Sequence, residues 1–132
     1  MNLLNHLQRL KESLEVLEEG IEKGLVERQR SIGFHTSAAC ADMLELFLHK
    51  NNLIDPGFIL KHEWLKSKNK TTEKLPFTFK NKDEILLLIF KIEEKRDLLC
   101  YGKPQSEVII REVLDSFRIL QKKFREIGLH EI

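Results

Sequence analysis

Long apolar runs and phosphate-binding loops are missing from this sequence, and their absence excludes several classes of protein. The longest uncharged apolar run, ILLLIF at residues 85–90, is far shorter than the roughly 20 residues that a membrane-spanning helix needs. The opening stretch, MNLLNHLQRLKESLEVLEEG, carries charges where a signal peptide needs an unbroken apolar core. No glycine-rich phosphate loop, paired catalytic carboxylate motif or nucleophile elbow occurs. We therefore expect a cytoplasmic protein without a membrane segment, outside the ordinary classes of metabolic enzyme.

Cysteine and histidine, the usual ligands of zinc, are few and scattered. The two cysteines, Cys40 and Cys100, lie in apolar helical patterns, and we expect free thiols at both. The five histidines are His6, His35, His49, His62 and His130. They lie far apart in the sequence with no paired spacing, so the sequence predicts no metal site and no cofactor.

The length and composition are those of one compact domain. A chain of 132 residues with 42% hydrophobic and 33% charged residues can bury a single core without disulfides or metals, so we expect one domain over residues 1–132. The net charge of +1 gives the chain as a whole no electrostatic reason to bind nucleic acid.

Positive charge is concentrated in one segment, residues 61–82. This segment has two acidic residues and seven lysines: Lys61, Lys66, Lys68, Lys70, Lys74, Lys80 and Lys82. Trp64, Phe77 and Phe79 lie between the lysines. Lysines interleaved with aromatic residues can hold phosphates by charge and stack on exposed bases. Alternatively, the segment is a solvated loop whose aromatic side chains cover the open side of the fold.

Apolar residues recur at helical spacing in several parts of the chain. The first stripe is Leu3, Leu7, Leu10, Leu14, Leu17 and Ile21; the second is Phe34, Ala38, Ala41, Leu44 and Leu48; the last is Ile110, Val113, Leu114, Phe117, Leu120, Phe124 and Ile127. Ser31 and Gly33 predict a break before the second helix. Asn81 and Asp83 can cap a further helix that runs to about Cys100.

The connections complete the fold prediction. NNLIDPG, at residues 51–57, is a turn by composition, residues 58–65 predict a short helix, and residues 66–82 show no helical period and predict a loop. LPFTF is the only strand-like piece. The sequence therefore predicts an all-α fold: a four-helix up-down bundle with an extra short helix and a long basic loop between the second and third main helices.

The third predicted helix ends in RDLLCYGKP, which gathers an arginine, an aspartate and a tyrosine near its last turn. Gly102 and Pro104 stop the helix there. From the residues alone, Arg96 is a cation that is favourable near a helix C-terminus, and Tyr101 is a half-buried anchor. The alternative is a ligand-binding site built from Arg96, Asp97 and Tyr101.

The order of the segments is a second line of evidence. A long amphipathic helix, RSIGFHTSAACADMLELFLHKNNL, KHEWLKS, ILLLIFKIEEKRDLLCYGKP and a closing amphipathic helix together resemble the HEPN domain, the all-helical family named for nucleotide binding in higher eukaryotes and prokaryotes. The resemblance covers nearly the whole chain and is greatest to small stand-alone prokaryotic members. It implies a two-fold homodimer whose arginine segments face a shared cleft. Many members are metal-independent ribonucleases, often toxins neutralised by a small nucleotidyltransferase-like partner.

The active motif of that family is an arginine followed about four to six residues later, between one and two helical turns, by a histidine. Arg96 matches the arginine, but the chain carries Cys100, Tyr101 and Gly102 at these offsets. A tyrosine, with an ordinary pKa of about 10, does not titrate near neutrality as the proton transfers of RNA cleavage require. The resemblance therefore implies a degenerate ribonuclease motif.

We predict an HEPN-like protein that binds a nucleotide or RNA through Arg96, Asp97 and Tyr101, assisted by Lys61 and His62. The resemblance further implies a homodimer that belongs to a toxin–antitoxin type of system. Because the motif histidine is missing, we expect the protein to be non-catalytic or weakly catalytic.

Two alternatives stay open at this point. The chain could be a non-catalytic interaction module whose exposed helical face docks a nucleotidyltransferase-like partner. It could also be an active metal-independent ribonuclease, because the spacing of the family motif occurs at Arg30 and His35 in RSIGFH, at the beginning of the second helix. In that case His35 would fold close to Arg96 and replace the missing histidine.

Overall fold

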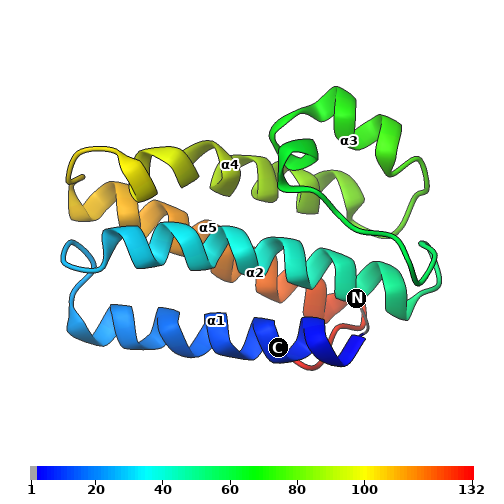
Figure 1. Cartoon of the computed structure of the whole chain (residues 1–132), viewed down its shortest axis with the longest axis horizontal. Helices are drawn as coiled ribbons and strands as arrows, with labels where there is room; N and C mark the ends of the chain where they lie inside the picture. Colours follow the sequence, from blue (N-terminus) through cyan, green and yellow to red (C-terminus); the bar gives the residue numbers. More distant parts are fainter. Residues whose placement is uncertain (1–2) are drawn as a thin grey trace.

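Helices make up all the regular structure in the computed structural model, which describes residues 3–132 (Figure 1). The long helices are α1 (Leu3–Lys23), α2 (Gln29–Lys50), α4 (Lys82–Tyr101) and α5 (Glu107–Glu126). The 3₁₀ helix η1 (His62–Lys66) and the short helix α3 (Lys68–Lys74) lie between α2 and α4 in the chain. The prediction of an all-α bundle is confirmed. Within the described range, no helix is both long and apolar enough to cross a membrane.

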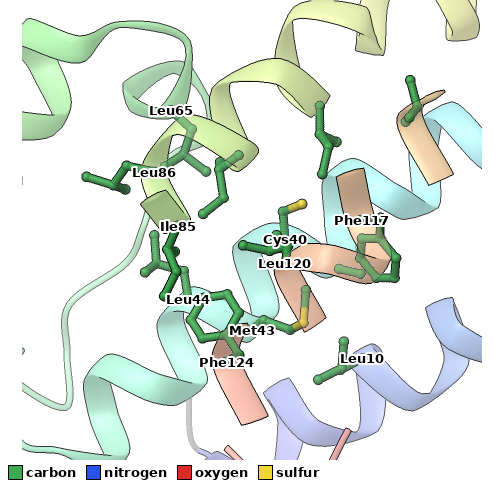
Figure 2. Close-up of a cluster of buried hydrophobic side chains, with 14 of the residues drawn as sticks. Leu10, Cys40, Met43, Leu44, Leu65, Ile85, Leu86, Phe117, Leu120 and Phe124 are labelled. Carbon is green, nitrogen blue, oxygen red and sulfur yellow. The ribbon is translucent and has the colours of Figure 1, made fainter. Parts of the chain in front are cut away.

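Helix α2 lies at the centre of the bundle and packs against α1, α4 and α5. Figure 2 shows side chains of α2 inside the core, among them Cys40, Met43 and Leu44. Because α2 has neighbours on three sides, its buried residues do not form a single stripe. The stripe predicted for this helix is wrong at Phe34, whose side chain is 48% exposed.

Helix α2 also begins earlier than the sequence indicates, at Gln29. The chain turns near Gly24, whose φ of +122° is a conformation that suits glycine. Gly33 lies inside this helix, at a point where α4 is so near that a Cβ at position 33 would be 2.5 Å from the Cβ of Leu99. The predicted break at residues 31–33 is therefore wrong, and the missing side chain of Gly33 allows close helix packing instead.

The loop predicted over residues 66–82 contains helix α3. The Ser67 side chain caps this helix by accepting a hydrogen bond from the backbone N–H of Lys70 at 3.2 Å. The hydroxyl of buried Thr71 donates to the carbonyl oxygen of Trp64 at 2.6 Å. These polar contacts, rather than an apolar stripe, hold the segment, which is why a search for helical periodicity does not find it. The short helix predicted over residues 58–65 corresponds to the 3₁₀ helix η1, which is shorter and begins later, at His62.

Candidate functional site

The first turn of α2 lies beside the end of α4, and Gln29 connects the two. Its side-chain amide donates to the carbonyl oxygens of Leu99 at 3.2 Å and Lys103 at 3.1 Å. Its Oε1 accepts the backbone N–H of Gln105 at 2.6 Å. Because Gln29 is buried, these bonds are shielded from water. They fix the connection between α4 and α5 against the start of α2 and so position the side chains that follow.

Two arginine–aromatic contacts form at this junction. The guanidinium carbon of Arg30 lies 5.8 Å from the ring centroid of Tyr101, and that of Arg96 lies 5.9 Å from the ring centroid of Phe34. Each pair joins one residue of α2 to one residue of α4. Both rings are largely accessible, with Tyr101 70% and Phe34 48% exposed. We call these four residues the arginine–aromatic surface.

Arg96 has hydrogen-bonding capacity that the protein does not use. Its Nε is buried, and no residue in the described part of the chain forms a hydrogen bond with it. Its Nη1 lies 3.7 Å from Oδ1 of Asp97, whose other carboxylate oxygen faces the ammonium of exposed Lys66 at 3.5 Å. The Arg96 side chain is 22% exposed, so it is held largely by the fold while part of it meets solvent.

His35 lies next to Phe34, at the same end of the bundle. The two rings are in edge-to-face contact, with centroids 5.1 Å apart, and Nδ1 of His35 is 3.2 Å from the hydroxyl of Ser13. Burial lowers the pKa of His35 below its ordinary value, and the nearby Glu12 carboxylate offsets part of this effect. His35 and Arg96 thus contact the same Phe34 ring, which brings Arg30, His35 and Arg96 into one region.

A hollow of about 500 Å³ lies between the two helix ends. It is lined by Glu27, Arg28, Arg30, Ser31, Phe34, His35, Cys100 and Tyr101. Its volume falls within the range of small-molecule sites. Burial raises the pKa of Cys100, and its thiol contacts the carbonyl oxygen of Arg30 at 3.8 Å, so this cysteine is a packing residue rather than a nucleophile.

Of the five predicted binding residues, Tyr101 lines this hollow, and Arg96, Asp97, Lys61 and His62 lie outside its lining. His62 Nδ1 is 3.3 Å from Oε1 of Glu93, a buried carboxylate that also accepts the hydroxyl of Ser37 at 2.5 Å. Lys61 is exposed at the residue before η1. The structure therefore brings Arg96 and Tyr101 together with Arg30 and His35 around the Phe34 ring, with Asp97 beside Arg96, and His62 contacts α4 one turn before Arg96.

The aromatic residues of the lysine-rich segment pack inward. Trp64 contacts Phe58 with ring centroids 5.8 Å apart, and Phe79 contacts Phe47 of α2 at 4.9 Å. The ammonium of Lys74 lies 5.4 Å from the Trp64 ring centroid. These rings cover the core, as expected for a solvated loop whose aromatic side chains close the open side of the fold. They do not form an open platform for bases.

Sequence reasoning missed two features of this molecule. It placed Phe34 in the core, although Phe34 follows Arg30 by one helical turn and shares its face. It also overlooked the spacing of Glu45 and His49, which are one turn apart on α2 and meet His6 of α1 in a buried cluster. The one-turn spacings are visible in the sequence, but the partner that completes each group comes from another helix.

No protein-family model, no curated protein and no solved structure matches the chain.

Proposed function

We propose that the arginine–aromatic surface binds single-stranded RNA or a nucleotide in the manner of an HEPN-like protein. The observation that carries the proposal is the pairing across the helix junction, where Arg30 meets Tyr101 and Arg96 meets Phe34. A guanidinium binds phosphate through its planar set of donors, and an exposed aromatic ring offers a face on which a base stacks. Both chemistries lie beside a hollow large enough for a nucleotide.

Preorganisation supports the same proposal. The Arg96 guanidinium is partly buried and rests against Phe34, so little side-chain freedom is lost when a phosphate binds. Its unpartnered Nε is a donor already separated from bulk water, and a phosphate oxygen that accepts from it would form a charge-assisted hydrogen bond. A homodimer, which the resemblance implies, is part of this proposal and would bring two such surfaces to one cleft.

The first test measures RNA binding by single variants. We expect Arg96→Ala to weaken binding of a labelled single-stranded RNA about 10- to 100-fold through loss of charged hydrogen bonds. Tyr101→Ala should weaken it about 5- to 150-fold through loss of base stacking. Fluorescence anisotropy in EDTA at several salt concentrations measures both effects.

Arg125→Ala is the matched control, because it removes one exposed positive charge from the end of α5, away from the α2–α4 junction. It should leave RNA affinity nearly unchanged, whereas Arg96→Ala should also reduce the dependence on salt, since a phosphate contact releases counterions. Unchanged RNA affinity in a folded Arg96→Ala variant would contradict the proposal. Wild-type protein that binds no RNA would favour the alternative function, a non-catalytic interaction module that docks a nucleotidyltransferase-like partner.

A second candidate function, metal-independent ribonuclease activity, is favoured by the position of His35. The imidazole lines the hollow with Arg30 and contacts the ring against which Arg96 rests. Burial lowers its pKa, so the ring is unprotonated at neutral pH and able to accept the proton of a ribose hydroxyl. Arg30 and Arg96 would stabilise the negative charge that develops on the phosphate.

The pH dependence of RNA cleavage tests this candidate. A general base acts only when unprotonated, so the rate should rise with pH, with its half-maximal point at the lowered pKa of His35, below the ordinary imidazole value of about 6.5. The rate should fall at least about 100-fold in His35→Ala, in keeping with the usual contribution of a general base, and stay unchanged in His130→Ala, which removes an exposed histidine. RNA that stays intact with concentrated protein in EDTA would exclude the ribonuclease and leave the binding proposal in place.

A further inference from the structure

Three potential metal ligands meet where α1 packs on the second half of α2. His6 comes from α1, and Glu45 and His49 come from α2. One ligand atom of each lies within 4.8 Å of the other two. Glu45 is about 22 Å along the helix axis from Arg30, although Phe34 of the arginine–aromatic surface lines the same cavity as His6 and Glu45.

The cluster is buried and partly unsatisfied. His6 is 4% and Glu45 is 5% exposed. The Nε2 atom of His49 is buried and has no hydrogen-bond partner among residues 3–132, whereas Nε2 of His6 is buried against a carboxylate. The His6 Nε2 lies in close contact with Oε2 of Glu45, and the two imidazole rings stack with centroids 5.9 Å apart. Buried polar atoms are rarely left unpaired, so the unpartnered Nε2 of His49 beside this pair points to a ligand.

Neighbouring groups orient two of the three ligands. Nδ1 of His6 lies 3.1 Å from Oδ1 of Asp42, which orients the ring; with the proton on Nδ1, the Nε2 lone pair is free to bind a metal ion in place of the contact with Glu45. The backbone N–H of Leu60 donates to Oε1 of Glu45 at 2.5 Å, so Oε2 is the oxygen that faces His6. A carboxylate behind a histidine and a hydrogen bond behind a carboxylate are the usual outer contacts of metal ligands.

We propose that His6, Glu45 and His49 form a binding site for a first-row divalent metal ion, for which Zn²⁺ is the best fit. Two imidazoles and one carboxylate are a known ligand set for zinc, with bonds of about 2.0–2.2 Å. Magnesium and calcium prefer oxygen ligands, so this site selects against them. In a tetrahedral site the ligand atoms lie roughly 3.3–3.5 Å apart, so metal binding requires the three atoms, now within 4.8 Å of one another, to adjust their separations.

The surroundings leave room for a fourth ligand. His6, Glu45 and Asp42 line a cavity of about 470 Å³, whose lining also includes His35 and His62. A water molecule in this cavity can therefore reach a metal ion held at its wall and complete a tetrahedron. The site is thus of the open type, with three protein ligands and one exchangeable position.

The test measures metal binding by tag-free protein that has been treated with EDTA and then desalted. Zinc titration by calorimetry should give equimolar binding, and Co²⁺ should produce the visible absorption of a four-coordinate nitrogen–oxygen site. Glu45→Gln and His49→Ala should each weaken zinc binding at least about 100-fold, because each removes a direct ligand. Asp42→Asn should weaken it about 10- to 100-fold by releasing the orientation of His6.

His130→Ala is the control, because it removes an exposed imidazole outside the cluster. It should bind zinc as the wild type does. Because His49 is only partly buried, His49→Ala tests the site even if variants of His6 do not fold. The proposal is overturned if wild-type protein binds no zinc, or if folded His49→Ala binds it as tightly as the wild type. In either case the cluster is an internal network of polar contacts around His6.

Discussion

Replacing Gly33 with alanine should lower the free energy of unfolding by about 1–3 kcal/mol, although alanine is the better helix former. The added Cβ would lie 2.5 Å from the Cβ of Leu99 and 3.4 Å from the sulfur of Cys100. Because the Leu99 Cβ is attached to the backbone of α4, it cannot rotate away. Helices α2 and α4 would have to separate, and the contacts along their interface would weaken.

Gly20→Ala is the matched control for this prediction. Gly20 is also buried inside a helix, but a Cβ there would meet its nearest neighbour, Cγ1 of Ile32, at 3.4 Å, which is an ordinary contact. Alanine should therefore raise the free energy of unfolding by about 0.5–1 kcal/mol through its lower conformational entropy in the unfolded chain. Urea denaturation followed by circular dichroism measures both variants. Changes of the same sign would contradict the close approach at Gly33.

The Gly33 variant also has a functional consequence. The contacts of Arg30 with Tyr101 and of Arg96 with Phe34 both cross the interface between α2 and α4. Any separation of the helices would move each guanidinium away from its ring. At a temperature where Gly33→Ala is folded, we therefore expect its RNA affinity to fall, whereas Gly20→Ala should bind as the wild type does. Equal affinities would mean that RNA binding does not require the paired arrangement.

How well the sequence predicts a helix depends on how many neighbours that helix has. Helix α5 packs against α2 and α4, and its apolar stripe is buried as predicted, with Ile110, Leu120 and Phe124 at 0% exposure. Helix α2 has a third neighbour, so even Thr36 and Ser37 are buried, with Thr36 donating to the carbonyl oxygen of Ile32 at 2.8 Å. Periodicity locates one buried face, and it fails for a helix that is buried on most sides.

Prediction from the sequence is limited in the same way for the single side chains of the candidate sites. Arg96 and Tyr101 can be identified from the sequence because they are neighbours at one helix end. Arg30 matters because a buried glutamine holds the start of α2 against that end, and no local pattern indicates this contact. The metal-ligand cluster is similar, since Glu45 and His49 share a helix face while His6 comes from another helix. Sites that depend on tertiary contacts become visible only in the folded chain.

Phe124→Ala should destabilise the fold more than Gly33→Ala does, lowering the free energy of unfolding by about 3–5 kcal/mol. The ring is fully buried and contacts Phe47 of α2 with centroids 6.0 Å apart, and Phe47 in turn contacts Phe79 (Figure 2 shows Phe124 in the core). The chain after α5 cannot collapse easily into the space, because the backbone N–H of buried Leu129 donates to the Phe124 carbonyl oxygen at 2.9 Å.

Ile119→Ala on the same helix is the control, because the Ile119 side chain is 50% exposed and lies outside the buried stripe. This substitution should lower the free energy of unfolding by less than about 1 kcal/mol, because folding removes little of the apolar area of Ile119 from water. Urea denaturation compares the two variants at equal protein concentration. Because a domain of this kind is stable by only about 5–15 kcal/mol, the Phe124 variant should have a clearly lower midpoint and a measurable unfolded population under mild denaturing conditions. Equal losses from both substitutions would mean that α5 does not pack through the face that carries Phe124, and the arrangement of α5 on α2 would then be wrong.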